Sequence, residues 1–140
     1  RLAFDNETIS LVKRLVFWHD YRFSESPRAM RRAVSKIGKD LMPLLFLVQM
    51  SDALAQNPMT IEEKLQRICS AAKLWQDVLL SKAALELKDL QISGKDLLDI
   101  GIPQGPELGK LLKMALEYVL EEPERNKKEF LLEWIGKNFL

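Results

Sequence analysis

Residues 93–112 read SGKDLLDIGIPQGPELGKLL and set the fold of the C-terminal part of the chain. Ser93 is a favourable N-cap, and Gly101 is a residue type that commonly follows the last turn of a helix. Pro106 suits the first turn of a helix, where a backbone N–H is not needed. The stretch predicts two helices joined by a glycine turn, running from Gly94 to Asp99 and from Glu107 to Leu120.

Helical signals also fill the rest of the chain, where apolar residues recur at a spacing of three and four. The further helices are expected at Asn6 to His19, Arg28 to Ile37, Leu41 to Ala55, Thr60 to Leu85, and from Asn126 to Phe139. Residues 5–8 supply N-cap candidates for the first helix, and Ser26-Pro27 marks the start of the second. Asp40 is expected to cap the third of the chain's helices, Thr60 and Glu63 to form a capping box for the fourth, and Asn126 to cap the last. The helix that starts at Leu41 is apolar nearly all round and should be the most buried.

A strand would fit only residues 87–92, so an all-α fold is predicted. Its expected form is an irregular helical bundle followed by a small helical tail with a helix-hairpin-helix-like turn. Short helices punctuated by glycines begin near residue 86, which places the boundary between a body domain, 1–86, and a tail domain, 87–140.

Charge is unevenly distributed, although the net charge of the 140 residues is only +1. Lys and Arg number nine against five Asp and Glu in residues 1–40, four against four in 41–85, and eight against eleven in 86–140, giving +4, 0 and −3. The N-terminal part is therefore the electrostatic candidate for an anionic partner.

Other bulk features favour a soluble cytoplasmic protein. Cys69 is the single cysteine, so it cannot form an internal disulfide, and it is expected to be an ordinary core residue. The longest apolar run, Leu41 to Met50, is about half the length that spans a bilayer, so no membrane segment is predicted. The sequence opens on Arg1 without an initiator Met, and we expect its beginning to be cut.

A self-contained active site is not expected. The sequence has no glycine-rich phosphate loop, no close carboxylate pair beside Gly-Ser, and one histidine. His19-Asp20 invites a metal-dependent phosphohydrolase interpretation, but a metal site needs more ligands, and a half-buried histidine at a helix end is the simpler interpretation. Asp52 lies in an apolar helix and needs a partner if buried. We therefore predict no catalytic residue and no metal ligand in this chain.

Two stretches could bind phosphate. Arg28, Arg31 and Arg32, with Lys36 a turn further on, share one face of a helix, and arginine matches phosphate oxygens; a merely solvated basic face fits the spacing equally well. In the tail, the Gly105-Pro106 turn leaves backbone N–H groups at a helix start, and Gly109 would let another backbone approach closely. Lys110 and Lys113 follow. A tight corner between two helices uses the same residue types, so the pattern alone does not distinguish a phosphate site from such a corner.

The tail run, from Ile92-Ser93-Gly94-Lys95-Asp96-Leu97 through Gly101-Ile102-Pro103-Gln104-Gly105-Pro106-Glu107-Leu108-Gly109 to Val119-Leu120-Glu121-Glu122-Pro123, resembles the tail of bacterial CCA-adding tRNA nucleotidyltransferases. Phe17-Trp18-His19-Asp20, Ser26-Pro27-Arg28-Ala29-Met30-Arg31-Arg32 and Ser51-Asp52-Ala53-Leu54-Ala55-Gln56 resemble the helical region before that tail. The resemblance covers nearly the whole chain.

The resemblance implies an enzyme that adds C, C and A to tRNA 3′ ends from CTP and ATP, with Mg²⁺ held by carboxylates of an N-terminal head. No motif of that head is in these residues, so this part should bind the tRNA elbow and be inactive alone. In HD-type relatives, His19 would correspond to a late histidine of the metal set and Asp52 to its closing aspartate. Two alternatives are the same region of a bacterial poly(A) polymerase and a fragment of an HD-type phosphohydrolase. The sequence does not predict the oligomeric state.

Overall fold

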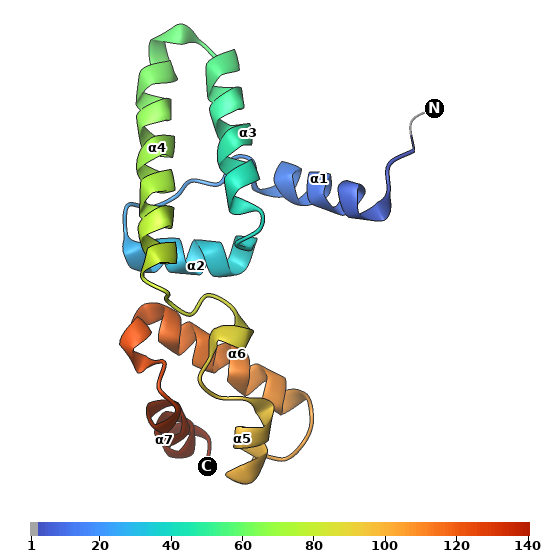
Figure 1. Ribbon diagram of the computed structural model, residues 1–140, viewed down its shortest axis with the longest axis vertical. Coiled ribbons are helices and arrows are strands. Elements are labelled where there is room, and N and C mark those ends of the chain that lie inside the picture. The colour runs from blue at the N-terminus through green and yellow to red at the C-terminus, as the bar shows by residue number, and fades with distance from the viewer. Residues whose placement is uncertain (1–2) are drawn as a thin grey trace. The chain divides into compact units, whose positions relative to one another are not determined.

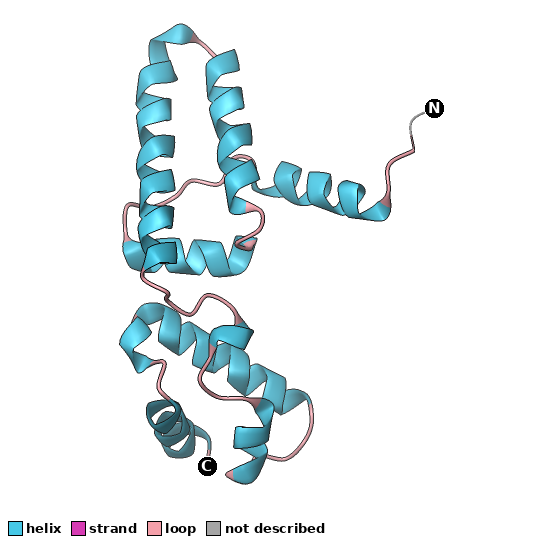
Figure 2. Ribbon diagram, viewed as in Figure 1, coloured by secondary structure: helices cyan, strands magenta, loops and turns pink. Residues whose placement is uncertain are grey.

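The computed structural model describes residues 3–140, and these residues form helices and loops without a strand (Figures 1 and 2). The all-α prediction is confirmed. The helices are α1 (Asn6–Trp18), α2 (Pro27–Ile37), α3 (Met42–Ala55), α4 (Pro58–Leu80), the 3-10 turn η1 (Leu87–Asp89), α5 (Gly94–Asp99), α6 (Pro106–Glu121), the 3-10 turn η2 (Pro123–Arg125) and α7 (Lys128–Phe139). The chain forms two compact units, Arg1–Leu80 and Ser81–Leu140.

Three helices begin at the caps that the sequence predicts. The Asp5 side chain accepts a hydrogen bond from the Thr8 backbone N–H at 2.6 Å, and the Ser26 side chain accepts one from Ala29 at 3.3 Å. Ser93 and Asp96 form a reciprocal capping box at the start of α5. These bonds satisfy backbone N–H groups that have no partner within the helix.

The predicted starts of α3 and α4 are wrong. Asp40 does not cap α3, because its carboxylate is paired with Arg14 and Leu41 precedes the helix without a side-chain cap. Helix α4 starts at Pro58 rather than Thr60, and the Asn57 side chain accepts the Met59 N–H at 3.2 Å.

Helix α4 also ends earlier than predicted, at Leu80 rather than Leu85. Lys82, just beyond it, adopts a left-handed φ of 53°, which a continuing right-handed helix excludes.

In the first unit, α3 and α4 pack against each other, and α2 packs against α4 (Figure 1). The buried side chains of this unit come mainly from α2 and from α3: Met30, Ala33, Val34, Ile37, Leu41, Met42, Leu45, Phe46, Ala53 and Val78. Aromatic rings extend this core, and successive ring centroids lie 4.8 to 5.8 Å apart along Phe17, Trp18, Tyr21, Phe23, Phe46 and Trp75. Such edge and tilted contacts are favourable for aromatic pairs.

The expectation that α3 would be the most buried helix is wrong. Leu47 and Leu54 are 60% and 61% exposed, because the first unit covers one side of α3 and leaves the other open. Cys69 is likewise exposed rather than in the core. Among the described residues, no helix is long and apolar enough to cross a membrane.

The second unit is built on α6, which contacts α5, α7, η1 and η2. Its buried side chains are Ala84, Leu85, Leu90, Ile92, Leu97, Ile102, Leu111, Ala115, Leu116, Val119, Leu120, Leu131 and Ile135. Tyr118 on α6 stacks on Trp134 of α7 at a centroid distance of 4.4 Å, and Arg125 lies over the Tyr118 ring at 4.2 Å.

Asn126 has a different role from the predicted cap of α7, whose preceding residue is Lys127. The Asn126 amide donates to the Asp89 carbonyl and its oxygen accepts the Gln91 N–H, both at 2.9 Å. This side chain therefore fixes the segment after η1, thirty-five or more residues away in sequence.

Candidate nucleic-acid interface

Helix α2 carries the basic residues that the sequence singled out. Its buried residues, Met30, Ala33, Val34 and Ile37, lie on one side of the helix. At about 100° per residue, Arg28 and Arg32 fall on the opposite side, and Arg31 and Lys36 lie at its two edges. Arg28, Arg32 and Lys36 are exposed, and Arg31 is half-buried. Helix α2 contains no acidic residue. Helix α2 itself therefore contributes only positive charge to this outer face.

The first unit holds α2 in place at both ends. At the start, Ser26 caps the helix, and near the end the Lys36 ammonium lies 5.6 Å from the centre of the Trp18 ring. Just past the end, Arg14 of α1 donates to the Ile37 carbonyl at 2.9 Å and to the Asp40 carboxylate at 3.0 and 3.2 Å. The Arg14 hydrogen bonds hold the pKa of Asp40 below its usual value.

The turn between α2 and α3 depends on Gly38. Its φ is +107°, and a Cβ atom there would lie 2.7 Å from Arg14 Nη2 and 2.7 Å from Asp40 Oδ1. Glycine therefore permits both the backbone conformation and the close contact with the Arg14–Asp40 pair.

The tail turn lies in the second unit, between α5 and α6. Gly101 ends α5 with a φ of +97°, and Gly105 with Pro106 begins α6 as predicted. No other segment of the chain approaches Gly109, because a Cβ there would meet no atom within 4 Å. The close contact lies at Gly94 instead, where a Cβ would be 2.8 Å from Leu108 Cδ2.

Lys110 and Lys113 are exposed on α6, on the side away from its buried residues. This side is not uniformly basic. Glu117 falls between them on the helical wheel, and Glu107 lies in the first turn of α6. The tail therefore offers weaker electrostatic attraction for phosphate than the outer face of α2.

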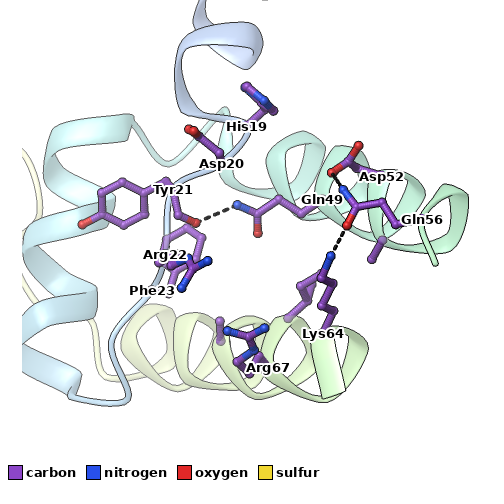
Figure 3. A pocket seen from close by; sticks show the side chains of 13 residues that line it. His19, Asp20, Tyr21, Arg22, Phe23, Gln49, Asp52, Gln56, Lys64 and Arg67 are labelled. Atoms are coloured by element: carbon purple, nitrogen blue, oxygen red, sulfur yellow. Dashed lines mark hydrogen bonds between the residues drawn. The ribbon is translucent and has the colours of Figure 1, made fainter. Parts of the chain in front are cut away.

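A groove in the first unit brings together residues that are distant in sequence (Figure 3). Its volume is about 330 Å³, and it lies between the loop after α1, α3 and the first half of α4. The lining residues include His19 and Asp20, Arg22, Gln49, Asp52, Gln56, Lys64 and Arg67. Both residues that the HD-type comparison singled out, His19 and Asp52, are therefore in one groove.

His19 and Asp52 are both exposed, unlike the half-buried histidine that the sequence favoured. The His19 Nδ1 lies 2.6 Å from the Val16 carbonyl, which is one turn earlier in α1. Asp52 accepts a hydrogen bond from the Gln56 amide at 2.8 Å, and the Lys64 ammonium donates to the Gln56 oxygen. Within residues 3–140, no group of three or more His, Cys, Asp or Glu side chains is placed to hold a metal ion.

Three cations of this groove, Arg22, Lys64 and Arg67, were not predicted from the sequence. Lys64 and Arg67 are three residues apart on α4 and so share a face, a signal that was readable from the sequence. Arg22 lies in a loop, and only the fold places it opposite α4.

Comparison with known proteins was made for the whole chain. The family model described as tRNA nucleotidyltransferase domain 2 matches residues 2–135. The CC-adding tRNA nucleotidyltransferase of Thermus thermophilus is 33% identical over 139 residues, which cover 96% of this chain and 30% of that protein. The chain thus spans about 30% of the length of the curated relative it matches. No solved structure gave a significant match.

Proposed function

Because this chain belongs to the tRNA nucleotidyltransferase family, we propose that it is the tRNA-binding C-terminal part of a CCA-adding enzyme. In this role it holds the elbow of tRNA, where the acceptor and T arms meet, while a catalytic head adds nucleotides from CTP and ATP. The Mg²⁺ that such a reaction uses would be bound by that head. The observation that carries the proposal is the family match over residues 2–135, and the outer face of α2 supplies the matching chemistry.

The outer face of α2 suits an RNA backbone. Arginine side chains fork onto phosphate oxygens, and contacts to phosphates position a nucleic acid without reading its sequence. The deep groove of an RNA helix also keeps side chains from the base edges, so recognition should depend on shape. We therefore propose Arg28, Arg31, Arg32 and Lys36 as the main phosphate contacts, with Lys110, Lys113 and the turn at Gly105 and Gly109 as a secondary contact.

The net charges of the two regions support α2 as the main phosphate contact and the tail as the secondary one. Residues 86–140 carry a net charge of −3, which would repel RNA unless the carboxylates face away from it. Residues 1–40 carry +4, and two of their exposed arginines, Arg28 and Arg32, lie on α2. Electrostatic attraction should therefore come mainly from the first unit.

Binding affinity tests the proposal. The affinity of the chain is measured for intact tRNA, for a minihelix of the acceptor and T arms, and for an unstructured RNA of equal length. We expect the tRNA and the minihelix to bind with similar affinity and the unstructured RNA to bind more weakly. Equal affinity for all three, or no binding to the minihelix, would contradict recognition of the elbow.

A double variant separates the α2 face from general attraction. Arg28→Ala with Arg32→Ala should weaken binding to all tRNAs alike and reduce the slope of log affinity against log salt by about 1 to 2. The matched control is Lys13→Ala with Lys73→Ala, which removes the same charge from exposed positions on α1 and α4. A control that weakens binding as much as the α2 variant would show that net charge alone is responsible.

A further inference from the structure

The groove at the end of α1 contains three cations that are separate from the proposed phosphate contacts of α2. Arg22 enters it from the loop after α1, and Lys64 and Arg67 enter it from α4 (Figure 3). Arg22 and Arg67 are exposed, and neither forms an ion pair with another described residue. Two unpaired guanidinium groups therefore share one concave surface.

The loop that carries Arg22 is anchored on both sides of that residue. Before it, the Tyr21 carbonyl accepts a hydrogen bond from the Gln49 amide of α3 at 2.9 Å. After it, the Phe23 ring packs on Phe46 with centroids 5.2 Å apart. The backbone at Arg22 is thus positioned beside the groove before any ligand arrives, which lowers the entropy that the loop loses on binding.

The carboxylates of the groove do not pair with Arg22 or Arg67, so both guanidinium groups can bind an anion. Asp52, the carboxylate on α3, already accepts the Gln56 amide, and Gln56 in turn accepts from Lys64. Asp20, the other carboxylate, points away from Arg22 in Figure 3. The side of the groove lined by Arg22 and Arg67 is therefore positive, and planar guanidinium groups bind phosphate oxygens through paired N–H donors.

We propose that this groove is a phosphate-binding site, in which Arg22 and Arg67 hold one phosphate of the bound RNA backbone and Lys64 adds positive charge beside it. The proposal rests on the proposed function for the identity of the ligand, and the site is separate from the outer face of α2. The groove volume of about 330 Å³ accommodates a nucleotide-sized group, so a phosphate could enter with its sugar attached.

The first experiment measures RNA affinity between 50 and 200 mM salt for the full chain and two double variants. Arg22→Ala with Arg67→Ala should bind tRNA about tenfold more weakly than the unmodified chain, with a salt slope lower by about 1. Lys13→Ala with Lys73→Ala removes the same charge outside the groove, because Lys73 lies on the opposite side of α4 from Lys64 and Arg67. If both variants bind equally, the site does not contact RNA and the proposal is overturned.

The second experiment follows the side-chain Nε–H signals of Arg22 and Arg67 by NMR during titration at low salt. The probes are inorganic phosphate, CMP and a short RNA without terminal phosphates, which distinguish a free ion, a nucleotide and a backbone phosphate. Shifts of these two signals with the short RNA support the proposal, and shifts with CMP alone overturn the RNA assignment. If the chain binds no tRNA, the proposed function fails. Shifts of the two arginine signals with inorganic phosphate would then still show an anion site in the groove. If no probe shifts these signals, the phosphate-binding site is rejected as well.

Discussion

Replacement of Gly38 by alanine tests how the turn between α2 and α3 is stabilised. Gly38 has a φ of +107° and a ψ of 135°, a conformation that costs an L-residue about 1–3 kcal/mol. The new methyl group would also lie 2.7 Å from Arg14 Nη2 and from Asp40 Oδ1, so the pair must move.

The loss of the Arg14–Asp40 pair adds a smaller cost. Their side chains are 38% and 68% exposed, and ion pairs at such positions contribute about 1 kcal/mol or less. The free energy of unfolding of the first unit should therefore fall by about 1–4 kcal/mol in Gly38→Ala, mostly from backbone strain. Asp40→Ala, which removes the pair but leaves the glycine and the Arg14 hydrogen bond to the Ile37 carbonyl, should cost no more than about 1 kcal/mol.

Urea unfolding followed by tryptophan fluorescence measures both variants. A Trp134→Phe background confines the signal to Trp18 and Trp75, which belong to the first unit. Midpoints are compared at an unchanged m-value, so that the shift reports stability. If Gly38→Ala is no more destabilising than Asp40→Ala, the positive φ does not strain an alanine in this turn.

Four further outcomes follow from the described residues. Gly109→Ala should raise the free energy of unfolding of the second unit by about 0.5–1 kcal/mol, because alanine has the higher helix propensity and its methyl group would meet no other atom. A lower free energy of unfolding would mean that the position is crowded. Hydrogen bonds from Lys128, and to a smaller extent from Ser93, lower the pKa of Asp96. Their stabilisation of the folded state is present above the unfolded carboxylate pKa of about 4 and is lost as the pH falls toward the folded pKa. The stability of Asp96→Asn in acid should therefore depend less on pH than that of the unmodified chain. Incubated with CTP, ATP and tRNA lacking CCA, the chain should incorporate no nucleotide above a heat-killed control, because it has no carboxylate pair of the kind that holds magnesium. Elemental analysis should find no stoichiometric transition metal, and a metal lost in His19→Ala would restore the hydrolase interpretation.

Local signals predicted the helices well where one residue type decides a boundary. Asp5, Ser26 and Ser93 cap helices as expected, since their side chains accept hydrogen bonds from backbone N–H groups three residues away. Asp40 and Asn126 have the same chemistry but use it on distant partners, Arg14 and the segment after η1. Capping propensity cannot distinguish these uses, because the competing partner becomes available only after folding.

Burial and site composition were harder to predict. The apolar composition of α3 indicated a central helix, yet Leu47 is exposed because helices pack on only one of its sides. The basic face of α2 was readable from spacing alone. The groove was not, since Arg22 lines the same groove as Arg67 only because the loop that carries it is anchored by Gln49.

Helix α1 contributes no buried side chain, although it starts with a proper cap and contacts α3. Its attachment near Arg14 consists of hydrogen bonds to the Ile37 carbonyl and to Asp40. A helix attached in this way gains little from the hydrophobic effect, so it can open without exposing the core formed by α2, α3 and α4. We therefore expect its amide hydrogens to exchange with solvent through a local opening whose free energy is smaller than that of unfolding the unit, so that α1 would behave as a separate foldon.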